Sequence, residues 1–147
     1  MSITYQMARN FKRKYPLTVA WRIKQHCKII DKHINPDEKV LYVFLGQKNA
    51  SSLDFVNTYV FALTNKRLIY ATKRLVFGYF FYAITPDMFN DLTVKQGLIW
   101  GKIIIDSVKE EVLLSNISKN ALDEIETKIT QYMMEEKKKY HPHDHRH

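Results

Sequence analysis

The last seven residues of the sequence hold its densest group of side chains that could bind a metal ion. Histidines alternate there at positions 141, 143, 145 and 147, with Asp144 among them. Imidazole is a common ligand for Zn²⁺ and Ni²⁺, and an extended segment can present several imidazoles to one ion. The same composition is typical of a flexible polar tail with incidental metal affinity. We therefore predict that residues 141–147 form a disordered, histidine-rich tail and that the protein has no metal site.

The remaining candidates for catalysis are one cysteine and several carboxylates. Cys27 follows His26, but neighbouring residues on a helix point about 100° apart, so adjacency alone does not make a nucleophile–base pair. A single cysteine forms no disulfide within the chain, which favours a reducing compartment. Glu110 and Glu111 stand among other charged residues, and four glycines are too few for a glycine-rich phosphate loop. The sequence predicts a protein that is not an enzyme, with no catalytic residues and no cofactor.

Positive charge is concentrated at the front of the chain. The net charge is +8, and residues 1–34 contain eight lysines and arginines against one acidic residue, Asp31. The rest of the chain has fifteen basic and fourteen acidic residues and is close to neutral. An anionic partner would be attracted first to this front segment, whether it is a nucleic acid, an acidic protein or a membrane surface.

Aromatic residues are interleaved with these basic residues. Trp21 and Ile29 fall on the lysine-rich face of a predicted helix, and an indole among lysines suits a membrane interface. Basic residues mixed with aromatic ones also suit contacts with a nucleic-acid backbone, and a solvated helix face is the plain alternative. We define the candidate interaction surface as Arg9, Lys12, Arg13, Lys14, Trp21, Lys24, Lys28 and Lys32.

The elements that would position these residues can be read from the spacing of apolar side chains. Residues 1–15 look irregular, and Pro16 opens a helix over residues 16–35 whose apolar stripe includes Cys27 and Ile30. Short runs rich in β-branched and aromatic residues follow, separated by polar turns, and a final amphipathic helix is predicted over about residues 117–138. The seven predicted strands are 40–46, 56–65, 68–74, 77–84, 90–96, 98–106 and 109–115.

Two parts of this strand region have further implications. The turn Thr64-Asn65-Lys66-Arg67 is short enough for a hairpin, and Asn65 tolerates the left-handed conformation that tight turns use. The aromatic run over residues 77–82 alternates between the two faces of its strand, and we expect the N-terminal helix to cover one of them.

The order of these segments resembles a known family, the pleckstrin-homology (PH) domains. Residues 60–70, which read Val-Phe-Ala-Leu-Thr-Asn-Lys-Arg-Leu-Ile-Tyr, are similar to the signature hairpin of small bacterial PH domains of the YokE-like type. The resemblance implies a mainly β fold with helices: a partly open seven-stranded barrel, or orthogonal sandwich, capped by a C-terminal helix. Here an extra N-terminal helix over residues 16–35 would pack on the barrel, and the PH-like domain would span residues 36–140. The resemblance then implies that the turn formed by Thr64, Asn65, Lys66 and Arg67 is a signature of the fold in the first place, and a binding site only in the second.

The resemblance implies a non-catalytic interaction module of a bacterium or phage, acting in the cytoplasm. Binding of an unidentified protein partner, or scaffolding, is the first expectation. Peripheral association with an anionic membrane through the basic N-terminal helix is the alternative, which would place the protein at the inner face of the membrane. A nucleic-acid adaptor is the second alternative. The first strand–strand loop, residues 47–52, has one lysine, so the resemblance does not imply phosphoinositide recognition.

Overall fold

The computed structural model describes residues 2–48 and 57–140; the predicted tail and most of the first strand–strand loop lie outside these ranges. Three helices, seven strands and two short 3-10 turns follow one another along the described chain. They are α1 (Ile3–Lys14), α2 (Ile23–His33), β1 (Val40–Lys48), β2 (Thr58–Thr64), β3 (Leu68–Lys73), β4 (Tyr79–Ile84), η2 (Pro86–Met88), β5 (Phe89–Gln96), β6 (Trp100–Ser107), β7 (Glu111–Ser118), η3 (Lys119–Ala121) and α3 (Leu122–Tyr140).

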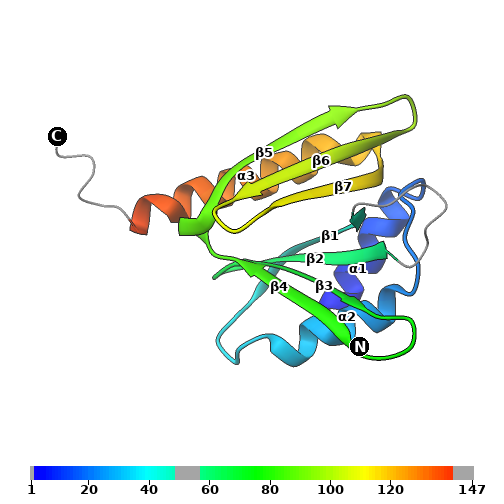
Figure 1. Cartoon of the computed structure of the whole chain (residues 1–147), viewed down its shortest axis with the longest axis horizontal. Helices are drawn as coiled ribbons and strands as arrows, with labels where there is room; N and C mark the ends of the chain where they lie inside the picture. Colours follow the sequence, from blue (N-terminus) through cyan, green and yellow to red (C-terminus); the bar gives the residue numbers. More distant parts are fainter. Residues whose placement is uncertain (1, 49–56, 141–147) are drawn as a thin grey trace.

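One antiparallel sheet forms the frame of the molecule, with the strand order β4-β3-β2-β1-β7-β6-β5. It curls into a half-barrel made of two half-sheets, β1–β4 and β5–β7 (Figure 1). β1 pairs with β2 along most of its length, and the described part of its ladder with β7, which ends at Lys48, contains the pairs Gln47 with Ser115 and Lys48 with Leu114. All seven predicted strands are confirmed, and β2 is buried at every position, so both of its faces are covered.

Helices cover the sheet on two sides. α1 and α2 pack on the face of β1–β4 that is turned away from β5–β7, and α3 packs against β5 and η2 (Figure 1). The predicted apolar stripe of the last helix is confirmed, since Leu122, Ile125, Ile129 and Met133 are all buried. The buried side chains that α1 and α2 contribute to the core include Ala8, Phe11, Cys27, Ile29 and Ile30.

An aromatic ladder runs across the four strands of the first half-sheet. Phe44, Phe61, Tyr70 and Tyr82 lie side by side on β1, β2, β3 and β4, and successive ring centroids are 4.8, 5.1 and 5.0 Å apart. Cross-strand aromatic pairs of this kind stabilise a sheet and fix its register. The ladder therefore makes β1–β4 the more rigidly specified half of the barrel.

The prediction that residues 1–15 are irregular is wrong. They contain α1, whose N-terminus is capped by Ser2: its hydroxyl oxygen accepts a hydrogen bond from the Tyr5 amide at 3.1 Å. Thr4, Ala8 and Phe11 are buried at helical spacing against the sheet. The high density of charged residues hid this stripe, because only two of its three members are apolar.

The predicted helix over residues 16–35 begins later than expected, at Ile23. The residues before it are held by the barrel instead: the Val19 amide donates to the Asn116 carbonyl at 2.9 Å, and the Ser118 amide donates to the Thr18 hydroxyl at 2.9 Å. Arg22 then turns the chain with a left-handed backbone, φ 57°. Contacts with the end of β7 thus override the helical pattern that began at Pro16.

The last helix also begins later than its predicted start at about residue 117. β7 continues through Ser118, which still pairs with Trp100 of β6, and α3 starts at Leu122 after a 3-10 turn. Asn116, next to the predicted start of this helix, adopts a left-handed backbone within the strand, φ 58°. Pairing with β6 is the tertiary contact that moves the boundary.

Candidate functional site

Three of the four basic residues of α1, namely Arg9, Lys12 and Lys14, contact other groups of the protein. The Lys12 ammonium donates hydrogen bonds to the carbonyls of Pro16 at 2.7 Å and Thr18 at 2.6 Å, and partial burial lowers the pKa of Lys12. Lys14 forms an ion pair with Glu124 of α3 at 2.6 Å. Arg9 lies over the Tyr5 ring, 5.6 Å from its centroid. Of the four predicted cations on this helix, Lys12 and Lys14 therefore tie α1 to its neighbours.

The predicted residues of α2 are divided between solvent and core. Lys24, Lys28 and Lys32 are exposed, as the sequence predicts. Ile29 is buried, so the expectation that it lies on the lysine-rich face is wrong. Trp21 precedes the helix and is 52% exposed, while its backbone amide donates to the Thr58 hydroxyl of β2 at 3.1 Å. The structure thus leaves Trp21 and these three lysines of the candidate interaction surface exposed, and their role in binding stays a prediction.

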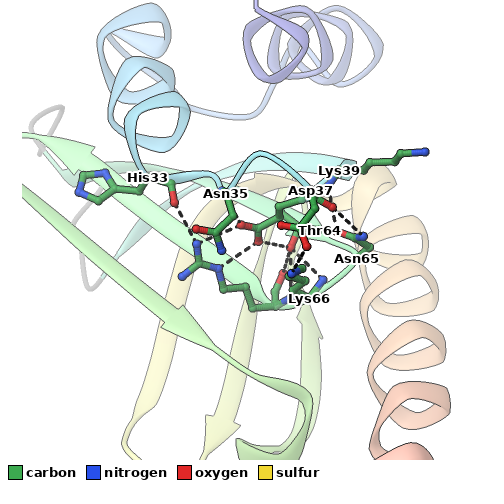
Figure 2. Close-up of polar contacts among 9 residues, drawn as sticks. His33, Asn35, Asp37, Lys39, Thr64, Asn65 and Lys66 are labelled. Carbon is green, nitrogen blue, oxygen red and sulfur yellow. Dashed lines mark hydrogen bonds and ion pairs between the residues drawn. The ribbon is translucent and has the colours of Figure 1, made fainter.

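The turn between β2 and β3 has a structural role that Figure 2 shows in detail. The Thr64 hydroxyl oxygen accepts hydrogen bonds from the amides of Lys66 and Arg67, both at 3.1 Å. The Asn65 side-chain oxygen accepts from the Lys39 amide at 2.8 Å, and the Lys66 ammonium pairs with Asp37 at 2.7 Å. Asn65 has no left-handed backbone, so that expectation is wrong: it shapes the turn through its side chain.

Glu38 lies at the centre of the same network, with a fully buried side chain. Its carboxylate accepts hydrogen bonds from Arg67 Nε at 3.0 Å and Nη2 at 3.1 Å, from the Thr64 hydroxyl at 2.5 Å and from the Asn35 amide at 3.2 Å. Arg67 Nη2 also donates to the His33 carbonyl at 3.0 Å. The network joins the end of α2 to the turn of the signature hairpin, and it needs no ligand to complete it.

A cation inside the barrel is held by aromatic rings. The Lys48 ammonium lies 4.6, 5.5 and 5.7 Å from the ring centroids of Tyr82, Tyr59 and Tyr70. The Tyr70 hydroxyl donates to the Glu110 carboxylate, and burial followed by this hydrogen bond raises the pKa of Tyr70. These groups satisfy one another, and none of them is arranged as a nucleophile beside a base.

The sequence did not single out the tip of the β3–β4 hairpin, which is the most exposed apolar segment among the described residues of the first half-sheet. Val76 and Phe77 are 69% and 81% exposed, and Leu75 beside them is exposed as well. Residue 77 was expected inside a strand, but β4 begins at Tyr79. An apolar triplet between two strands, where polar turn residues are the rule, was the signal that could have found this tip.

Hydrogen bonds fix the Trp21 segment to the base of this hairpin. The Arg22 guanidinium donates to the carbonyls of Lys73 at 3.1 Å and Arg74 at 3.4 Å. His26 Nδ1 accepts from the Lys73 amide at 2.8 Å, and His26 Nε2 lies 2.9 Å from the Trp21 carbonyl, to which it donates. The tip, Trp21 and the cations around them therefore form one connected surface.

The expected cover of the aromatic strand β4 by the N-terminal helix is confirmed over part of its length. His33 at the end of α2 stacks on Phe81, with ring centroids 4.3 Å apart, and contacts the edge of the Tyr79 ring. Phe80 lies on the other face of the strand and remains exposed. Aromatic surface is thus left open next to the hairpin tip.

A second apolar tip lies at the same end of the molecule. The β5–β6 hairpin ends in Leu98, which is 86% exposed, and in Ile99 and Trp100, which are also exposed. The Trp100 indole donates to the Leu17 carbonyl at 2.6 Å, which joins this hairpin to the segment before Trp21. Both hairpins turn on the right-hand side of Figure 1. We name this end the loop face and define it by residues 17–22, 73–79 and 95–102.

Charge on the loop face has a single sign. Its three segments contain Arg22, Lys73, Arg74, Lys95 and Lys102 and no aspartate or glutamate. The turns at the opposite end of the half-barrel include acidic residues, among them Asp37, Asp87 and Glu110. The loop face therefore combines protruding apolar side chains with five basic residues.

Other kinds of site find less support in the part of the chain that the structure describes. Within residues 2–48 and 57–140, no group of three or more histidine, cysteine, aspartate or glutamate side chains is placed to hold a metal ion. Over the same residues, no helix is both long enough and apolar enough to cross a membrane. Burial raises the pKa of Cys27 to about 12, so its thiol stays protonated near neutral pH.

Most of the chain matches a known protein family. Residues 34–131 match a family model described as "Bacterial PH domain". A crystal structure of a pleckstrin homology domain from Shewanella amazonensis is similar, with 13% sequence identity, a TM-score of 0.49, and coverage of 77% of this chain and 89% of that one. The search of curated proteins gave no match.

Proposed function

This chain belongs to the bacterial PH domain family, and from that premise we propose that it is a non-catalytic module that docks on anionic membrane surfaces through its loop face. The family is the one that the sequence of residues 60–70 resembles; the YokE-like subtype stays a prediction. PH domains generally mediate protein or lipid interactions and are generally not enzymes. The inner face of the bacterial cytoplasmic membrane is the location we propose.

The observation that carries this proposal is the pairing of apolar tips with cations on the loop face. Full burial of a valine, leucine or phenylalanine side chain contributes about 1.5–3 kcal/mol, so insertion of Val76, Phe77 and Leu98 would be a strong attraction. A lysine or arginine near an anionic bilayer adds about 1 kcal/mol. Trp21 is exposed beside the tip, where an indole would lie at headgroup depth.

A protein partner is the second candidate, and a different observation favours it. β4 and β5 end the strand order, so each pairs with a single neighbour in the described sheet. An unpaired strand edge can accept an extended segment of another protein as a further strand. Protein binding, which was the first expectation from the sequence, therefore stays a prediction, and the edges of β4 and β5 are the location that we propose for it.

The membrane proposal predicts a large effect of polar residues at the β3–β4 tip. In the full chain, Val76→Ser combined with Phe77→Ser should weaken binding to vesicles of phosphatidylcholine and phosphatidylglycerol at least about tenfold, because roughly 1.4 kcal/mol of inserted apolar surface gives that factor. Binding is measured by co-sedimentation, with graded fractions of phosphatidylglycerol at low and at physiological salt. Both positions are exposed, so the fold should be unaffected.

Val108→Ser is the matched control for this experiment. Val108 is as exposed as Val76 but lies after β6, outside the loop face. Its substitution should leave vesicle binding unchanged. Absence of binding by the unaltered protein on strongly anionic vesicles would contradict the proposal. So would nucleic-acid binding that falls steeply with salt and outcompetes vesicles, which would instead favour the adaptor alternative.

A further inference from the structure

Two lysines face each other across the β5–β6 hairpin. Lys95 and Lys102 are direct cross-strand partners, and both are exposed. Side chains in this relation extend from the same face of a sheet with Cβ atoms about 4.5–5.5 Å apart, and like charges placed so are destabilising. Neither ammonium has an ion-pair partner among the described residues. The pair thus leaves an uncompensated concentration of positive charge at one point of the loop face.

A shallow hollow of about 270 Å³ lies between these lysines and the strand beside them. Trp100 lines it, and the hydrogen bond from the indole to the Leu17 carbonyl fixes the ring there. The rest of its lining is polar or lacks a side chain: Gln96, Gly97, Gly101, Ser115 and Asn116. No carboxylate contributes, unlike the hollow at the opposite end of the half-barrel, where Lys109 lies beside Glu110. The chemistry of this hollow is that of an anion site.

We infer that Lys95 and Lys102 form a binding site for a phosphomonoester group, with the fixed Trp100 ring as one wall. A phosphomonoester carries about two negative charges at pH 7 and three acceptor oxygens, which matches two ammonium groups better than the single charge of a phosphodiester. The inference rests on the proposed function in one respect: on a docked loop face, the group would come from the headgroup of a lipid with a terminal phosphate. A soluble phosphomonoester would offer the same chemistry.

Nuclear magnetic resonance separates the site from the membrane. Titration of the full chain with inorganic phosphate should give saturable shifts of the Trp100 indole signal and of the amides of residues 95–102. The Lys95→Gln/Lys102→Gln variant should lose these shifts, and Lys109→Gln, on an exposed lysine outside the hollow, should keep them. Removal of the like-charge pair should leave the unfolding temperature unchanged or slightly higher, so a loss of binding would not reflect misfolding.

A vesicle experiment then identifies the source of the phosphate. Vesicles with phosphatidic acid and vesicles with phosphatidylglycerol are compared at equal surface charge. The unaltered protein should bind phosphatidic acid at least fivefold more tightly, and the Lys95→Gln/Lys102→Gln variant should lose this preference while it still binds both. If glycerol 3-phosphate shifts the same signals but the vesicles show no preference, the site is supported and its ligand is soluble.

Two results would overturn the inference. Phosphate shifts that do not saturate, or that persist in the Lys95→Gln/Lys102→Gln variant, would mean that phosphate meets only diffuse charge. Absence of phosphate-induced shifts, together with equal binding to phosphatidic acid and phosphatidylglycerol vesicles, would also mean that the two lysines do not form a phosphate site. Failure of the membrane proposal is distinguishable, since the Val76→Ser/Phe77→Ser variant would then behave like the unaltered protein on vesicles while the phosphate titration stayed intact.

Discussion

Replacement of Arg67 by alanine should lower the free energy of unfolding by about 3–5 kcal/mol, the usual cost of leaving one partner of a buried ion pair alone. The Glu38 side chain is fully buried, and Arg67 supplies two of the four hydrogen bonds to its carboxylate. Burial acts to raise the pKa of Glu38, yet the bonds from Arg67, Thr64 and Asn35 together hold it below its usual value. Without Arg67, two of the hydrogen bonds that compensate the buried carboxylate are lost, and the His33 carbonyl also loses a donor. Urea unfolding measures the change.

Lys66→Ala is the control in the neighbouring position. The Lys66–Asp37 pair is exposed on both sides, and such pairs contribute about 0–1 kcal/mol. A double variant, Glu38→Gln with Arg67→Ala, should be more stable than Arg67→Ala alone, because it has no unpaired carboxylate buried at position 38. If Arg67→Ala lowers the free energy of unfolding no more than Lys66→Ala does, then solvent reaches Glu38 and the network does not stabilise the fold as we expect.

The second large effect is a loss of stability as the pH falls from about 6.5 to about 4. Burial, together with the nearby Arg22 charge, lowers the pKa of His26 to about 4 from its ordinary 6.5, although the bond to the Trp21 carbonyl acts in the opposite direction. In this window the unfolded chain binds a proton at His26 that the folded chain does not, so folding becomes less favourable as protons are added. The full shift corresponds to about 3 kcal/mol. Above pH 6.5 both states are neutral and the effect vanishes.

His26→Gln isolates this contribution. A glutamine amide can accept from the Lys73 amide and donate to the Trp21 carbonyl, as His26 does, but it does not titrate. Chemical denaturation at several pH values should therefore give a flatter profile for the variant between pH 6.5 and 4.5. At lower pH both proteins should lose stability as Glu38, whose pKa lies below its usual value, takes up a proton. Parallel profiles in the upper window would contradict the assignment to His26.

The sequence predicted the strands well because each is a short run rich in β-branched and aromatic residues between polar turns. Val60, Ala62 and Thr64 alternate with Tyr59, Phe61 and Leu63, and the structure buries both sets between the helices and the second half-sheet. The elements before β1 were harder to predict. α1 exposes so many basic residues that its short buried stripe was obscured, and the start of α2 is set by hydrogen bonds to residues almost a hundred positions away.

The candidate site could be predicted only in part. Trp21 was visible in the sequence and belongs to the surface that we propose, but Arg22 is the one basic residue of the front segment that lies on the loop face. The uses of Lys12 and Lys14 were not visible, because their partners, the Pro16 and Thr18 carbonyls and Glu124, depend on how the helices pack. The loop face could not be predicted either: it brings together three segments far apart in the chain.

We expect the two half-sheets to open independently at the junction of β1 and β7, because α1 and α2 pack on β1–β4 whereas α3 packs against β5. Within residues 2–48 and 57–140, two residue pairs continue the pairing across this junction, whereas β1 and β2 are paired at seven positions. Native-state hydrogen exchange should therefore resolve two cooperative units, with amides of β1–β4 protected longer than those of β5–β7. Uniform protection across both halves would contradict this view. A hinge here would let the tips of the β3–β4 and β5–β6 hairpins change their separation without unfolding.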